Sequence, residues 1–296
     1  MKKGMFTGMI ASLALLAGLA LARPAPAGEI ELLDTPREAG PWQAVGQLIL
    51  DRSATCSGTL ISPDIVLTAA HCLYEKRSGQ QIAPGSILFL AGERRGRAAA
   101  MRRVVAAVIA RGYVYRDPRK LERIANDLAL LRLEAPIPPS RIAPFLAAGI
   151  LAPGHKVDLV SYNATSALRR DTATLEDGCR TLTREGRVAV LSCDVDSGAS
   201  GAPVFRIIDG RPQIVAIVSA KARLAGRKVA LASVLDGRIE ALRARLPAAP
   251  LLAAAASAAT DAASPAEPRP LPRILPHRLG GREIDRGVGA RFVRPE

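Results

Sequence analysis

The chain has 296 residues, and its hydrophobic content of 49% is enough to bury a core in one domain or two small ones. This content excludes a chain that is disordered throughout. The formal net charge of +14 comes from scattered arginines without interleaved aromatic residues, so it predicts a solvated basic surface and no specific nucleic-acid partner.

The first 27 residues have the layout of a secretory signal peptide. Two lysines precede an apolar run from about Met9 to Leu21, and small-residue cleavage sites end at Ala22 and Ala27. The run is shorter than the roughly 20 residues that span a bilayer. We therefore predict export to a periplasm or the extracellular space, with no stable membrane anchor after cleavage. Residues 28–41 are then an N-terminal arm or a short propeptide.

Export would place the four cysteines in an oxidising compartment, where disulfides are favoured over metal thiolates. The cysteines are Cys56, Cys72, Cys179 and Cys193, and no two of them form a C-x-x-C pair. A zinc site is therefore not expected, and we predict neither a metal nor an organic cofactor. Of the three connectivities that four cysteines allow, we favour Cys56 with Cys72 and Cys179 with Cys193.

Short β-prone runs, punctuated by Gly, Pro, Asp and Ser, fill the chain from Gln47 onward and predict an all-β fold. Their spacing indicates barrels or sandwiches. A Pro-rich linker at 135–140 separates a first β unit, 42–134, from a second, 141–235. The predicted strands are Gln47–Leu50, Asp64–Thr68, Ser86–Ala91, Val104–Ile109, Asp127–Leu133, Lys156–Tyr162, Arg187–Leu191, Pro203–Ile207 and Gln213–Ser219.

A helical pattern replaces the strand pattern after Val234. Apolar residues at Ile239, Leu242 and Leu246 are three and four positions apart, which predicts a helix at 236–246 that begins at Asp236. From 247 to 296 Ala, Pro and Arg dominate, and we predict a disordered tail.

Two segments carry residues suited to general-base catalysis. The run Thr-Ala-Ala-His71-Cys72 follows an apolar strand, and a disulfide to Cys56 would hold the imidazole in place. Asp127 opens another apolar strand, where a buried carboxylate could orient the imidazole and stabilise its charged form. Taken singly, a histidine at the end of a strand or an aspartate in a turn more often has a structural role than a catalytic one.

A third segment, 193–205, could supply a nucleophile. Small residues surround Ser200 and allow a tight turn, in which the N–H groups of Gly198 and Ser200 could stabilise an oxyanion. Ser197 is the nearby rival for this role. A serine needs a base, and His71 is better placed than His155 or than His277 in the tail.

The order His71, Asp127, Ser200 and the residues around each resemble the trypsin/chymotrypsin family of serine peptidases. The resemblance spans roughly Trp42 to Leu246. It implies two six-stranded antiparallel β-barrels, a catalytic triad in the cleft between them, and a C-terminal helix. It also implies a monomeric endopeptidase that cleaves protein or peptide substrates through an acyl-enzyme.

The segment around Ser200 and the pair Pro41-Trp42 resemble those of bacterial members of the glutamyl-endopeptidase-like branch. These members share the pattern Gly-x-Ser-Gly-x-Pro and a Pro-Trp pair near the mature start. Animal-type members carry an aspartate before the nucleophile, and it pairs with a new N-terminus after zymogen cleavage. Here Ala199 occupies that position. The resemblance therefore does not predict activation by that salt bridge.

The resemblance also points to a specificity pocket. Asp194 lies six residues before Ser200, where trypsin-like members bind a substrate Arg or Lys. Lys221 and Val229 occupy wall positions that glycine usually fills, so the lysine could neutralise Asp194 or favour acidic substrates. Ser219 belongs to the strand lining the cleft and is expected to support Asp127. Both basic and other preferences remain open.

Two other functions are alternatives to the hydrolysis of peptide bonds. A blocked pocket at Lys221 and Val229 would leave a catalytically impaired, peptidase-like module that binds peptides. A basic exported binding protein could instead contact anionic polymers through the tail at 247–296.

Overall fold

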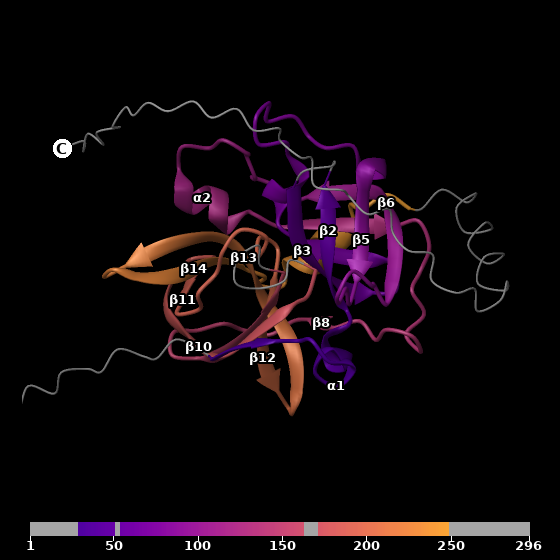
Figure 1. Cartoon of the computed structure of the whole chain (residues 1–296). Coiled ribbons are helices and arrows are strands. Elements are labelled where there is room, and N and C mark those ends of the chain that lie inside the picture. Colours follow the sequence, from indigo (N-terminus) through magenta and orange to yellow (C-terminus); the bar gives the residue numbers. More distant parts are fainter. Residues whose placement is uncertain (1–28, 51–53, 163–170, 249–296) are drawn as a thin grey trace, which may run out of the picture.

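The structure is a computed structural model that describes residues 29–50, 54–162 and 171–248. The predicted signal peptide and nearly all of the predicted tail lie outside these residues. The described chain is built mainly from antiparallel strands (Figure 1). The strands are β1 (Glu29–Leu32), β2 (Val45–Leu50), β3 (Ala54–Ser62), β4 (Ile65–Thr68), β5 (Ile87–Ala91), β6 (Ala100–Ile109), β7 (Ala129–Leu133), β8 (Leu146–Ala147), β9 (Lys156–Ser161), β10 (Thr174–Glu185), β11 (Val188–Leu191), β12 (Pro203–Ile208), β13 (Arg211–Leu224) and β14 (Arg227–Val234).

The helices are short. They are α1 (Pro36–Ala39), α2 (Lys120–Ala125) and α3 (Arg238–Arg243), with 3₁₀ turns at Gly40–Trp42, Ala70–Leu73 and Pro84–Ser86. No helix in the described residues is long and apolar enough to cross a membrane.

The first barrel closes in the order β2-β3-β4-β7-β6-β5, because β2 pairs with both β3 and β5. Aliphatic and aromatic side chains such as Leu48, Leu67, Phe89 and Leu130 are fully buried inside it. Closure removes the exposed edges that an open sheet would present. The pairing of β4 with β7 sets Thr68 opposite Ala129, so the chain segments that follow β4 and precede β7 meet at one end of the barrel.

The second barrel runs through β9, β10, β11, β14, β13 and β12, and the pairing of β12 with β9 closes it. Two further strands extend its sheet, since β1 pairs with β10 and β8 pairs in parallel with β13. Two antiparallel six-stranded barrels confirm the predicted fold class.

The N-terminal arm is part of the fold from residue 29 onward. Its β1 adds a strand to β10, and Thr35 begins α1 with a capping box to Glu38. Asp34 forms an ion pair with Arg95, next to the first barrel. Backbone pairing therefore holds this segment in place.

Aromatic side chains join the two barrels. Trp42, Phe145 and Phe205 form a cluster in which the ring centroids of Trp42 and Phe205 are 5.1 Å apart and those of Phe145 and Phe205 are 4.7 Å apart. Their contacts belong to a single hydrophobic core that draws residues from both barrels. The barrels are therefore packed against each other through apolar burial.

The C-terminal helix is shorter than the predicted 236–246. Asp236 and Gly237 have φ values of 44° and 71°, in the left-handed region, so helical geometry begins only at Arg238. Ile239 and Leu242 are buried, as the spacing of apolar residues predicts, and Leu246 packs just beyond the helix.

Candidate active site

His71 and Asp127 meet where the first barrel ends. His71 lies in the 3₁₀ turn after β4, and Asp127 lies between α2 and β7. The backbone N–H of His71 donates to Oδ1 of Asp127 at 2.8 Å, and Nδ1 of the imidazole is 2.7 Å from Oδ2. The Asp127 side chain is only 3% exposed, whereas that of His71 is 24% exposed. The buried carboxylate thus holds both the backbone and the ring of His71 and leaves part of the ring accessible.

A serine of the second barrel completes this arrangement. The hydroxyl of Ser219, on β13, donates to Oδ2 of Asp127 at 2.5 Å. Because Asp127 occupies the Nδ1 side of the imidazole, Nδ1 carries the proton and Nε2 remains the basic nitrogen. This is the tautomer that a general base requires.

Disulfides hold both sides of the site. Cys56 on β3 is bonded to Cys72, with Cα atoms 6.3 Å apart, which ties the His71 turn to the barrel. Cys179 on β10 is bonded to Cys193, with Cα atoms 5.3 Å apart, and anchors the segment that leads to Ser200. Both pairs are the ones favoured from the sequence.

Ser57 of the first barrel positions the turn that contains Ser200. Its backbone N–H donates to the carbonyl of Ser200 at 2.8 Å, and its hydroxyl donates to the carbonyl of Gly198 at 3.0 Å. The same hydroxyl accepts the N–H of Tyr162 at 3.0 Å. One small residue next to Cys56 therefore connects the two barrels at the turn that contains Ser200.

Gly201 lies in close contact with the first barrel. Its φ is +79°, and a Cβ atom there would be 2.2 Å from Oγ1 of Thr68 and 2.4 Å from the carbonyl oxygen of Ser57. Thr68 in turn donates to that carbonyl at 2.8 Å. The residue after Ser200 therefore must be glycine for both conformational and steric reasons.

Two backbone N–H groups flank Ala199. Within the described residues, neither the N–H of Gly198 nor that of Ser200 donates a hydrogen bond, although Gly198 is buried. Buried backbone donors normally have partners. The Ser200 hydroxyl and His71 also share no hydrogen bond here, a contact that commonly tightens only when substrate is bound.

Each of the predicted specificity residues has a different partner. Asp194 forms a salt bridge with Lys228 at 3.0 Å, and Lys221 forms one with Asp196 at 2.6 Å. Ser219 is directed to Asp127, and Val229 is buried opposite Ala222. Lys221 alone of the four lines a nearby cavity of about 280 Å³. The other residues that line this cavity are Val195, Asp196, Ala222, Arg223 and Lys228.

A buried glutamate supports the segment before Ser200. Both carboxylate oxygens of Glu176 accept the backbone N–H of Asp194 at 3.0 Å. Burial raises the pKa of Glu176 from 4.5 to about 7, and the charge of Asp194 adds to this rise.

The sequence did not reveal the roles of Ser57, Thr68 and Glu176, because each depends on a contact with a distant segment. The only local signal for Ser57 is its small size beside Cys56. Two groups of potential metal ligands occur in the described residues, one around His71 and one around Glu176. Both depend on cysteines that are bonded in disulfides, so no thiolate remains to bind an ion.

The structure thus combines two antiparallel β-barrels, a hydrogen-bonded His71–Asp127 pair and a Ser200 turn held by the first barrel. Residues 56–217 match the family described as trypsin-like peptidase domain. This match covers more than half of the chain, and the chain belongs to that family.

Individual relatives agree with this assignment. Serine protease SP24D of Anopheles gambiae is 33% identical over 93 residues, a match that spans 31% of this chain and 31% of that relative. A solved Glu endopeptidase structure superposes with a TM-score of 0.60 at 17% identity, covering 74% of this chain and 96% of the other. A thermostable serine protease, AL20, from an extremophilic microorganism has a TM-score of 0.56 at 15% identity, covering 69% and 96%. At these identities the two solved structures support the fold alone.

Proposed function

We propose that the chain is a catalytically active, exported serine endopeptidase with His71, Asp127 and Ser200 as its triad. The observation that carries the proposal is the chain of hydrogen bonds from Ser219 through Asp127 to His71. It orients one imidazole nitrogen as a base, next to a turn whose backbone is held by the other barrel.

In the proposed reaction the Ser200 hydroxyl oxygen attacks the carbonyl carbon of the substrate peptide bond, and Nε2 of His71 takes the hydroxyl proton. The N–H groups of Gly198 and Ser200, which are free of other acceptors in the described residues, stabilise the oxyanion. His71 then gives the proton to the leaving amine, and an acyl-enzyme remains. Water, deprotonated by His71, hydrolyses this ester and restores the serine.

A fluorophosphonate probe tests the nucleophile directly. We expect the mature protein to be labelled at Ser200, and we expect Ser200→Ala and His71→Ala to lose the label. The matched control is Ser197→Ala, which removes the neighbouring hydroxyl and should keep full labelling. Labelling that survives Ser200→Ala, or no labelling of the folded wild type, would overturn the proposal. In the second case, tight peptide binding without cleavage would identify a peptide-binding module.

The cavity near Ser200 supports a preference for an acidic residue on the amino side of the cleaved bond. Three cations, Lys221, Arg223 and Lys228, line it with one acid, Asp196. Asp194, the candidate for binding a basic substrate, is paired with Lys228. One fold relative is itself named a Glu endopeptidase. Lys221 is paired with Asp196, so among the described residues Arg223 is the lining cation without a salt bridge, and its guanidinium favours a carboxylate ligand.

Peptide substrates that differ only in Glu, Arg or Leu at that position would measure the preference. We expect kcat/KM to be highest for Glu and to fall about tenfold or more for Glu alone in Lys221→Met or Arg223→Met. Arg211→Ala, an exposed residue outside the cavity, is the control. A preference for Arg that disappears in Asp194→Asn would contradict this assignment.

Export is proposed from the N-terminal signal pattern together with the two disulfides. Mass spectrometry of the protein recovered outside the cytoplasm should find a new N-terminus near residue 28. An intact Met1 on the exported protein would contradict cleavage of the signal.

A further inference from the structure

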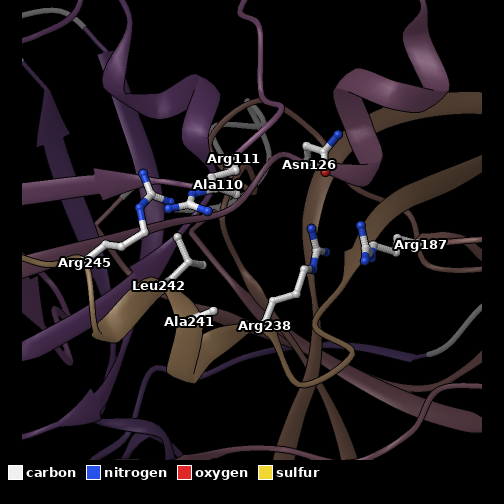
Figure 2. Close-up of a pocket in the computed structure, with 8 residues that line it drawn as sticks. All are labelled: Ala110, Arg111, Asn126, Arg187, Arg238, Ala241, Leu242 and Arg245. Carbon is white, nitrogen blue, oxygen red and sulfur yellow. The ribbon is translucent and has the colours of Figure 1, made fainter.

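A second cavity, of about 350 Å³, lies at the junction of α3 with both barrels (Figure 2). Its lining comes from four separate stretches of the chain: the residues after β6, the residue before Asp127, the residue before β11, and α3 with the turn after it. The lining residues are Ala110, Arg111, Asn126, Arg187, Arg238, Ala241, Leu242 and Arg245. A cavity of this size is in the range of small-molecule sites.

The lining contains four arginines and no acidic residue. In Figure 2, Arg111 and Arg245 lie on one side of the cavity, Arg187 and Arg238 lie on the other, and Leu242 and Ala241 lie between them. Guanidinium groups from segments far apart in the sequence therefore face a common space above an apolar floor.

The described residues place little negative charge against these arginines. Within the part of the chain that the structure describes, none of the four arginines forms a salt bridge. Arg238 donates instead to neutral groups, among them the carbonyls of Ala125 at 2.8 Å and Leu235 at 3.2 Å. Asp236, the acid that acts on Arg238, is itself bonded to Arg184 at 2.7 Å.

The environment of Arg238 disfavours its positive charge. Burial, together with the nearby charge of Arg187, lowers the pKa of Arg238 to about 10. Holding like charges together without a counterion is costly, and an anion among them would relieve the repulsion. Guanidinium forks match the paired oxygens of phosphate and carboxylate groups.

We propose that this cavity, defined by Arg111, Arg187, Arg238 and Arg245, is a binding site for a small multivalent oxyanion, one that carries at least two phosphate or carboxylate groups. Two arginines on each side suit one anionic group at each end of the ligand, and the apolar floor suits the atoms between them. The site goes beyond the proposed peptidase activity and does not depend on it.

The position of the site connects it to the candidate triad. Arg238 and Ser233 both donate to the carbonyl of Ala125, at 2.8 and 3.1 Å, and Asn126 in the lining precedes Asp127 directly. A ligand in the cavity would therefore rest against the turn that supports the carboxylate of Asp127.

The test measures binding to the mature Ser200→Ala protein, which cannot digest itself. Inorganic pyrophosphate and glutarate are the probes for the phosphate and carboxylate forms of the ligand. Sodium chloride at equal ionic strength corrects for general screening of a basic protein. We expect at least one probe to bind with saturable one-to-one stoichiometry in calorimetry and to raise Tm by about 5 °C near saturation.

The informative variant is Arg111→Ala with Arg187→Ala, which removes one guanidinium from each side. Neither side chain makes a hydrogen bond in the described residues, so the variant should fold. Its control is Arg77→Ala with Arg211→Ala, which removes the same charge from exposed positions elsewhere. We expect the first pair to lose binding at least tenfold and the control pair to keep it. Equal loss in both pairs, or no saturable binding by either probe, would overturn the proposal.

Discussion

Replacing Gly201 by alanine tests whether contact with the first barrel fixes the nucleophile turn. Alanine at φ +79° costs about 1–2 kcal/mol in backbone energy. The new Cβ would lie 2.2 Å from Oγ1 of Thr68 and 2.4 Å from the Ser57 carbonyl, which forces the barrels apart and adds about 1–3 kcal/mol. We expect Gly201→Ala to lower the free energy of unfolding by about 2–5 kcal/mol and to abolish labelling by a fluorophosphonate.

Gly154→Ala separates the two costs, because Gly154 has a similar φ of +82° but nothing within 4 Å of its Cβ position. The free energy of unfolding of both variants is measured with urea in a Ser200→Ala background. We expect Gly154→Ala to lower it by the backbone cost alone. The midpoints of the two variants should then differ by about 1 M urea. If Gly201→Ala is no less stable than Gly154→Ala, the steric reasoning is refuted.

Three further changes test the groups around the candidate triad. Ser219→Ala removes a hydrogen bond to the Asp127 carboxylate and should lower kcat about tenfold or more with little change in KM, measured on a peptide substrate. Ser57→Ala leaves the carbonyl of Gly198 and the N–H of Tyr162 without their hydroxyl partner, and it should cost about 2 kcal/mol in urea unfolding and slow labelling of Ser200. Because the pKa of Glu176 is raised from 4.5 to about 7, the folded state holds a proton that the unfolded state loses, so stability falls as pH rises between these values. Glu176→Gln should reduce this pH-dependent loss in the free energy of unfolding by on the order of 3 kcal/mol. A dependence of stability on pH that is the same as in the wild type would contradict the raised pKa of Glu176.

The strands that the sequence predicted contain short apolar runs. The predicted strand at Ser86–Ala91 corresponds to β5, and the one at Arg187–Leu191 corresponds to β11. The sequence missed β10, whose Glu-Asp-Gly interrupts the alternation, because Gly178 has a φ of +72° and the pairing register shifts there. Helix α2 was also missed, since its six residues are too few to show a helical period.

The sequence suggests the candidate triad because each of its members lies in a short local motif. The contacts of the candidate specificity residues join distant segments, and the sequence does not show them. The partner of Asp194 is Lys228, 34 positions later, and the partner of Lys221 is Asp196, 25 positions earlier. Which acid meets which base depends on how the β13–β14 hairpin folds over the loop before Ser200. The spacing of these residues in the sequence does not predict which acid pairs with which base.

The arrangement of the site explains why the nucleophile turn and the barrel interface cannot be separated. Ser200 belongs to the second barrel, yet its carbonyl is held by Ser57 of the first, over a sequence separation of more than a hundred residues. Asp127 belongs to the first barrel, yet Ser219 of the second donates to it. Each barrel thus positions the catalytic candidate that the other carries. The packing of the two barrels through Trp42 and its aromatic neighbours therefore contributes to the placement of the candidate triad residues.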